Sequence, residues 1–202
     1  MKNFVRVFFF FSVLFLGITI NSNAQNFEWI WQNSYPLGNN YNDITMLPGG
    51  ALVGVLDGGA VVRSTDGGTV WSVSYPDSLN GNRSIYEATF LNANVGYASG
   101  LDGLVMKTVD GGITWTQLST GSVEDFWYIE FINADTGYVC GTTSALLKTT
   151  NGGANWNPIT VTGTSTLLYK VHFVNASTGF IGTSSATVGR LLKTTDYGAT
   201  WV

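Results

Sequence analysis

Reactive side chains are scarce in this sequence. Cysteine occurs once, at Cys140, so no disulfide can form within the chain, and the only histidine is His172. Cys140 lies in a strand-like stretch and is expected to be a buried thiol, while His172 is expected to be structural. No Ser, His and Asp set, glycine-rich phosphate loop or cluster of metal ligands stands out, so we expect neither a metal nor a cofactor.

Positive charge and long apolar runs are also rare. The chain has nine Lys and Arg against thirteen Asp and Glu, which disfavours nucleic acid and anionic membrane surfaces as partners. The one long apolar run, Val7 to Ile20, follows a basic start and is shorter than the roughly 20 residues of a spanning helix. Residues 1–24 are therefore predicted to be a signal peptide cleaved near Ala24, with the mature chain secreted, periplasmic or at the cell surface and without a membrane span.

Glycine and aromatic residues are abundant, and many of them belong to a string that occurs four times. Its copies run over Ser64–Trp71, Thr108–Trp115, Thr149–Trp156 and Thr194–Trp201. The third residues of the copies are Asp66, Asp110, Asn151 and Asp196. Their spacing of 44, 41 and 45 residues matches one four-stranded propeller blade.

A second repeated segment precedes each of the last three strings. It begins at Phe90, Phe131 and Phe173 and continues to a Gly-Tyr or Gly-Phe pair. Each unit therefore reads as four strands: one ending at the Phe, one starting at the Gly, one before the string and one after its Trp. The predicted fold is all-β, a propeller of four-stranded antiparallel blades with about four blades present, as part of a larger ring.

The repeats also give the domain boundaries. Within a propeller domain of residues 25–202, the blades are predicted at 37–80, 81–122, 123–163 and 164–202. Residues 27–36 resemble the fourth strand at 71–76 and are predicted to be an orphan outer strand. This strand could complete the last blade, but we favour a fragment of a longer protein, and a monomer if the chain is complete.

The first strands alternate in the last three repeats. One face is expected to carry Tyr86, Ala88 and Phe90, then Trp127, Ile129 and Phe131, then Tyr169, Val171 and Phe173. The other face carries Glu87, Glu130, Lys170 and His172. Because both faces of a blade meet neighbours, we expect these polar residues to be spread along the central channel or blade edges rather than gathered into a site.

The repeated string is best explained as a tight hairpin. An Asp can accept hydrogen bonds from the N–H groups of its own turn, Gly supplies positive φ, and the Trp can cover the hairpin. We therefore assign structural roles to every copy. These residues are Asp66, Trp71, Asp110, Trp115, Asn151, Trp156, Asp196 and Trp201.

The strings resemble the Asp-box, or BNR, repeats of sialidases, sortilin-type receptors, xyloglucan hydrolases and the photosystem II assembly or stability factor-like family. The longer pattern is most similar to the last family and covers nearly all of residues 27–202. The resemblance implies a β-propeller. It does not imply photosynthesis, because photosystem factors use an arginine-rich surface and the mature chain has only Arg63, Arg83 and Arg190.

The same scarcity of arginine argues against a sialidase. Such a site would need three arginines, and Arg63 occupies the repeat position of Lys107, Lys148 and Lys193. Paired carboxylates of the xyloglucan hydrolase type are not marked by any motif. We therefore expect a binding protein rather than an enzyme.

Topology predicts which end of the blades binds. The connections between second and third strands and between blades share one end, away from the Asp-containing strings, and loops on a rigid scaffold commonly carry function. The candidate ligand-binding residues at this end are Asp77, Arg83, Glu124, Asp125, Trp127 and Arg190.

The sequence thus predicts an exported, non-catalytic propeller that binds a protein or carbohydrate ligand. Two alternatives stay open. One is a fragment of a secreted glycoside hydrolase of the sialidase or xyloglucanase type. The other is a bacterial surface protein with a further sorting domain.

Overall fold

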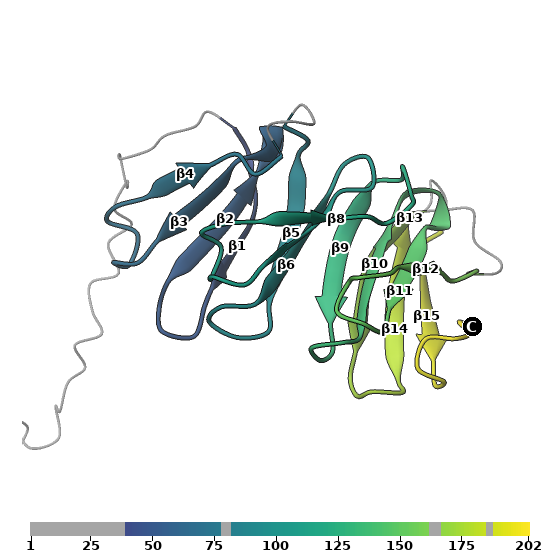
Figure 1. Cartoon of the computed structure of the whole chain (residues 1–202). Coiled ribbons are helices and arrows are strands. Elements are labelled where there is room, and N and C mark those ends of the chain that lie inside the picture. Colours follow the sequence, from purple (N-terminus) through teal and green to yellow (C-terminus); the bar gives the residue numbers. More distant parts are fainter. Residues whose placement is uncertain (1–38, 78–81, 162–166, 185–187) are drawn as a thin grey trace, which may run out of the picture. The chain divides into compact units, whose positions relative to one another are not determined.

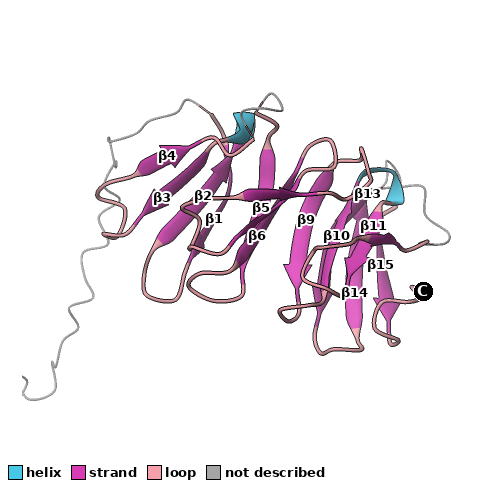
Figure 2. Cartoon of the chain, in the orientation of Figure 1, coloured by secondary structure: helices cyan, strands magenta, loops and turns pink. Residues whose placement is uncertain are grey.

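A computed structural model describes residues 39–77, 82–161, 167–184 and 188–202 (Figure 1). The predicted signal peptide and the predicted outer strand at 27–36 lie outside these ranges. The described residues belong to one compact unit, Ser34–Val202. Apart from two short 3-10 turns, their regular structure is β-strand (Figure 2).

The strands form four antiparallel sheets in which each strand pairs with its neighbours in sequence. The first sheet contains β1 (Tyr41–Met46), β2 (Leu52–Leu56), β3 (Val61–Ser64) and β4 (Ser72–Ser74). The second contains β5 (Ile85–Phe90), β6 (Gly96–Gly100), β7 (Val105–Thr108) and β8 (Thr116–Leu118). The third contains β9 (Phe126–Phe131), β10 (Gly137–Gly141), β11 (Leu146–Thr149) and β12 (Asn157–Pro158).

The fourth sheet has three strands, β13 (Leu167–Phe173), β14 (Gly179–Ser184) and β15 (Arg190–Thr194). Val202 exchanges two backbone hydrogen bonds with Lys193, at 2.7 and 3.0 Å, where a fourth strand would pair. This arrangement confirms the predicted all-β fold of four-stranded antiparallel blades, about four in number.

The expected alternation of the first strands is wrong in their first half. Each of β1, β5, β9 and β13 contains a register shift of the β-bulge type. In β5, Ile85 rather than Tyr86 enters the core, and in β13 Leu168 is fully buried while Tyr169 is 60% exposed. A bulge places two consecutive residues against one partner, which reverses the side on which the preceding residues lie. The expectation holds for Ala88, and for its equivalents in β9 and β13.

The core lies between successive sheets and repeats an aromatic pattern. The Phe131 ring stacks on Tyr97 of the preceding sheet, with centroids 3.6 Å apart, and meets Trp156 edge-on at 6.0 Å. Phe173 lies between Tyr138 and Trp201 in the same way. Such pairs add to the burial of apolar area, so the repeated Phe and Trp lock each sheet to the one before it.

The first and last sheets expose the faces that are buried elsewhere in the array. Ile44 of β1 is 55% exposed, whereas Ala88 at the equivalent place in β5 is 4% exposed against the first sheet. Leu191 of β15 is 69% exposed, whereas Leu146 at the equivalent place in β11 is buried against the fourth sheet. Among the described residues, nothing covers these two outer faces as the inner ones are covered.

Candidate functional site

The four repeated strings, here called the Asp-box turns, share one hydrogen-bond pattern. In the second turn, Asp110 Oδ1 accepts hydrogen bonds from the N–H groups of Ile113 and Thr114 at 3.0 and 2.9 Å. The Thr108 hydroxyl donates to the same oxygen and accepts from the Gly112 N–H. Equivalent bonds hold the other three turns, and in the third the Asn151 carbonyl replaces the carboxylate.

These bonds also set the charge of the aspartates. Although burial alone would raise the pKa of Asp110, hydrogen bonds from Thr114, Thr108 and the turn backbone hold it at about 2. Donation from Thr200 likewise lowers the pKa of Asp196 to about 2. A carboxylate that is ionised and occupied by its own turn is a poor proton donor at neutral pH.

Each of the last three turns is tied to the preceding sheet by a cation. Arg63 Nε donates to the Gly111 carbonyl at 2.9 Å, and Lys107 Nζ donates to the Gly152 carbonyl at 3.3 Å. Lys148 Nζ reaches the Tyr197 carbonyl at 2.7 Å. Arg63 therefore has the same structural position as Lys107 and Lys148.

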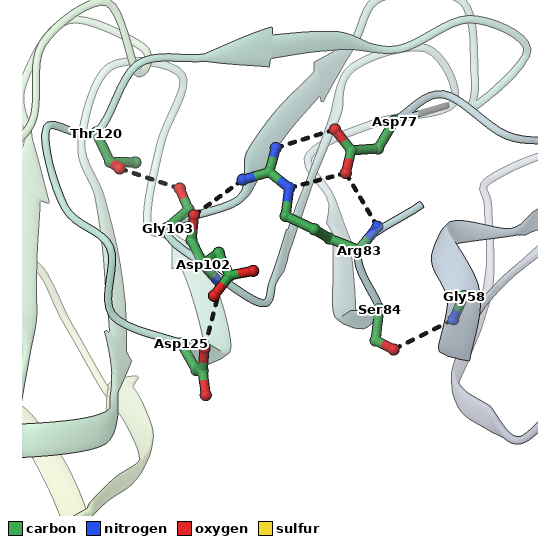
Figure 3. A network of polar contacts seen from close by, with 8 residues as sticks. All are labelled: Gly58, Asp77, Arg83, Ser84, Asp102, Gly103, Thr120 and Asp125. Carbon is green, nitrogen blue, oxygen red and sulfur yellow. Dashed lines mark hydrogen bonds and ion pairs between the residues drawn. The ribbon is translucent and has the colours of Figure 1, made fainter. Parts of the chain in front are cut away.

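The opposite end of the sheets, here called the loop end, holds the β2–β3, β6–β7 and β10–β11 connections and the segments that join one sheet to the next. Two predicted site residues are paired there. The Arg83 guanidinium donates to both carboxylate oxygens of Asp77, at 2.8 and 2.9 Å, and its third nitrogen donates to the Asp102 carbonyl (Figure 3). Asp77 is only 2% exposed, so this pair fastens the segment between the first two sheets.

Two further candidates hold the next junction. Asp125 Oδ1 accepts the Asp102 N–H at 3.1 Å (Figure 3), and the Glu124 carboxylate accepts the Thr142 hydroxyl at 2.8 Å. Hydrogen bonds from Thr143 and Thr142 lower the pKa of Glu124. Both carboxylates are therefore held in place by the loops of the second and third sheets.

The last two candidates, Trp127 and Arg190, lie in different sheets. Trp127, half-buried at the bulge of β9, stacks on Tyr86 of β5 with ring centroids 4.3 Å apart and an interplanar angle of 16°. Arg190 begins β15, where its N–H donates to the Thr183 hydroxyl at 3.0 Å. The structure thus brings Asp77 together with Arg83 and Glu124 together with Asp125, at neighbouring junctions.

A groove of about 390 Å³ opens at the loop end of the third sheet. One wall is the segment from Thr120 to Glu124, and the other is the β10–β11 connection with the edge of β11 and β12. Its lining includes the apolar residues Leu146, Leu147 and Ile159 and the polar residues Thr120, Ser122 and Glu124. The groove thus combines apolar and hydrogen-bonding groups, as ligand sites do.

The rim of this groove contains an unusual backbone conformation. Thr143 and Ser144 have φ of 49° and 61°, whereas Gly103 and Gly59 occupy the place of Ser144 in the two preceding sheets. Non-glycine residues with positive φ are strained, and such strain concentrates at functional sites. The repeat therefore departs from its own turn chemistry beside the groove.

Polar residues of the first strands contact the first strand of the next sheet. Glu130 Oε1 lies 3.1 Å from His172 Nδ1, and its Oε2 accepts the Phe173 N–H at 3.2 Å. Asp43 likewise accepts the Ala88 N–H at 3.2 Å. Because each first strand is a sheet edge with unpaired N–H groups, a carboxylate from the preceding sheet satisfies it.

Glu87 differs from these two acids. Burial raises its pKa to about 7, with a further contribution from the charge of Asp43 and opposition from Lys170. The Lys170 ammonium lies 4.5 Å from the centre of the Tyr128 ring. Asp43, Glu87, Tyr128 and Lys170 each stand three residues before the end of an aligned first strand. These four residues are here called the row containing Glu87. Their shared repeat position is the sequence signal that could have revealed the row.

Among the described residues, no group of three or more His, Cys, Asp or Glu side chains is placed to hold a metal ion. No helix in the described ranges is long and apolar enough to cross a membrane. The Cys140 thiol is buried, and burial raises its pKa.

Antiparallel four-stranded blades, each with an Asp-box turn after its third strand, define this chain as a β-propeller protein. The family model described as Photosynthesis system II assembly factor YCF48 matches residues 77–163 and 120–202. These matches span more than half of the chain, which therefore belongs to that family. No curated protein sequence matches the chain significantly.

Solved structures agree on the fold. YCF48 from Cyanidioschyzon merolae is 16% identical with a TM-score of 0.62, and the match covers 83% of this chain and 57% of that one. A structure of YCF48 bound to D1 peptide is 20% identical with a TM-score of 0.58, covering 76% and 50%. The GH74 xyloglucanase from Xanthomonas campestris is 17% identical with a TM-score of 0.64, covering 81% and 29%. This chain thus spans about half the length of the YCF48 chains.

Proposed function

We propose that this protein is an exported, non-catalytic propeller that binds an extended segment of a partner protein at its loop end. The groove beside β11 and β12 carries this proposal, because its mixture of apolar and polar lining residues suits the side chains and backbone of an extended polypeptide. The YCF48 structure solved with D1 peptide shows that a protein of the same fold takes a peptide. The basic start and apolar run of residues 1–24 support export.

The interactions of the candidate residues support binding over catalysis. Asp77, Arg83, Glu124 and Asp125 each accept or donate hydrogen bonds that position a loop. Groups held in this way give a rigid binding surface, which lowers the entropy cost of association. Of these four residues, Glu124 lines the groove directly.

The test uses the full chain and peptides selected on it from a random twelve-residue display library. Pro158 is exposed and lines the groove, so Pro158→Trp should fill the groove and weaken the selected peptides at least tenfold. Ala93→Trp, at an exposed position of the Asp-box end, is the matched control and should leave affinity unchanged. Equal losses in both variants, or no selected peptide, would contradict the proposal.

A second candidate function is glycoside hydrolysis, which the likeness to the GH74 xyloglucanase favours. Glu87, with its pKa near 7, is the group best poised to act as a general acid. Release of reducing sugar from xyloglucan by the full chain, abolished by Glu87→Gln, would establish this activity. If the unsubstituted chain releases no reducing sugar from xyloglucan, binding remains the better-supported function.

A further inference from the structure

The aromatic rings of Tyr86 and Trp127 meet at the loop end. The bulges in β5 and β9 carry Tyr86 and Trp127 out of the core alternation, and the two rings stack almost parallel. Both side chains are half-buried, so part of the stacked pair remains in contact with solvent. A flat aromatic surface of this kind attracts cations to its π face.

Negative charge surrounds the pair. Burial raises the pKa of Tyr86, and the charges of Asp125, Asp57 and Asp102 raise it further, which places these three carboxylates within electrostatic range of its hydroxyl. Asp102 and Asp125 come from the adjoining loops of the second and third sheets (Figure 3). The aromatic surface therefore lies in a negative field.

The nearest cation of this network does not cancel that field. Arg83 directs its guanidinium to the two Asp77 oxygens and to the Asp102 carbonyl, so its charge is matched by Asp77 (Figure 3). The Glu87 carboxyl, next to Tyr86 in the sequence, accepts no hydrogen bond from a described residue. The surface keeps an excess of acceptors.

One polar atom of the pair also lacks a partner. The indole N–H of Trp127 is buried without a hydrogen bond to any described residue. A polar group left unsatisfied inside a protein costs free energy.

We propose that the stacked Tyr86 and Trp127 rings and the carboxylates around them form a docking surface for a polypeptide segment that carries lysine or arginine. This inference rests on the proposed function and names the chemistry of its partner. A lysine stem can pack on the rings while its ammonium lies among the aspartates, which a neutral or acidic side chain cannot match. The segment from Thr120 to Glu124, which directly precedes Asp125, also lines the groove.

The experiment measures fluorescence anisotropy of the full chain with two labelled decapeptides, one of alternating Lys and Gly and one of alternating Glu and Gly. The Lys peptide should bind and the Glu peptide should not. Tyr86→Leu should weaken the Lys peptide three- to fivefold, and Tyr86→Phe, which keeps the ring, should restore affinity. Asp125→Asn keeps an oxygen acceptor for the Asp102 N–H, so it tests charge with the loop bond intact.

Asp135→Asn supplies the matched control, because it removes the same charge from the Asp-box end. Asp125→Asn should weaken the Lys peptide at least threefold and Asp135→Asn less than 1.5-fold. Equal effects of the two changes, or equal binding of both peptides, would overturn the inference. A neutral or acidic peptide that binds the groove and is lost in Pro158→Trp would also overturn it while leaving the proposed function intact.

Discussion

The Asp-box end and the loop end of the sheets differ in how their hydrogen bonds repeat. At the Asp-box end the same bonds recur in each turn, and a cation from one sheet joins the turn of the next. At the loop end each junction uses its own residues, Asp77 with Arg83 at one and Glu124 with Thr142 at another. The difference teaches that the repeated end maintains the array, while the variable end provides surfaces that differ from blade to blade.

The largest expected effect is at the Asp-box end. Trp156 is 7% exposed and packs edge-on against Phe131, so Trp156→Ala should lower the free energy of unfolding by about 3 to 5 kcal/mol. Chemical denaturation monitored by far-UV circular dichroism measures this loss. A value below about 1 kcal/mol would mean that the Trp of the turn does not hold the sheets together.

A smaller loss is expected at the loop end. Asp77→Asn removes the charge that pairs with Arg83, and breaking a buried pair costs about 3 kcal/mol when both partners are fully buried. Because Arg83 keeps 14% side-chain exposure, we expect about 2 kcal/mol. Thermal unfolding compares this variant with Asp102→Asn, which leaves the Arg83 contact to the Asp102 carbonyl in place. Equal stability of the two variants would remove the structural role of the pair.

The smallest expected effect is a loss of folding stability at acidic pH. The pKa of Asp110 is lowered to about 2 in the folded protein, from an ordinary value near 3.8. A lowered pKa stabilises the fold above the ordinary value, and that contribution disappears as pH falls from about 4 through 2. Asp110→Asn should cost about 1 kcal/mol at pH 7 and nearly nothing at pH 2. Urea denaturation at both pH values tests this, and a pH-independent difference would contradict it.

Much of the fold could be predicted because the same residue types recur at the same positions in each repeat. The Phe that ends a first strand, the Gly that begins the second and the Trp after the turn each have one geometric role. Gly137 shows why: a Cβ there would fall within 2.7 Å of the Phe131 ring. Spacing and residue type were sufficient to place these features.

The bulges and the candidate site could not be placed in the same way. Periodicity predicted Tyr86 on the same face as Ala88 and Trp127 on the same face as Ile129, yet register shifts interrupt the alternation at both residues. Opposite the shifts, Gly100 and Gly141 allow close approach of the Ser84 and Asp125 carbonyls, a contact between strands that no single strand's pattern reveals. The groove was missed because its walls come from separate connections.

By itself, the sequence determined the blades, their order and the hairpin chemistry of the Asp-box turns, because these depend on residues close together in the chain. Only the tertiary structure decided which polar residues meet. The Arg83 pair, the row containing Glu87 and the stacked Tyr86 and Trp127 rings depend on strand register and on packing between sheets. A shift of one residue in a strand changes the side on which every following side chain lies, so those contacts become fixed only when the sheets assemble.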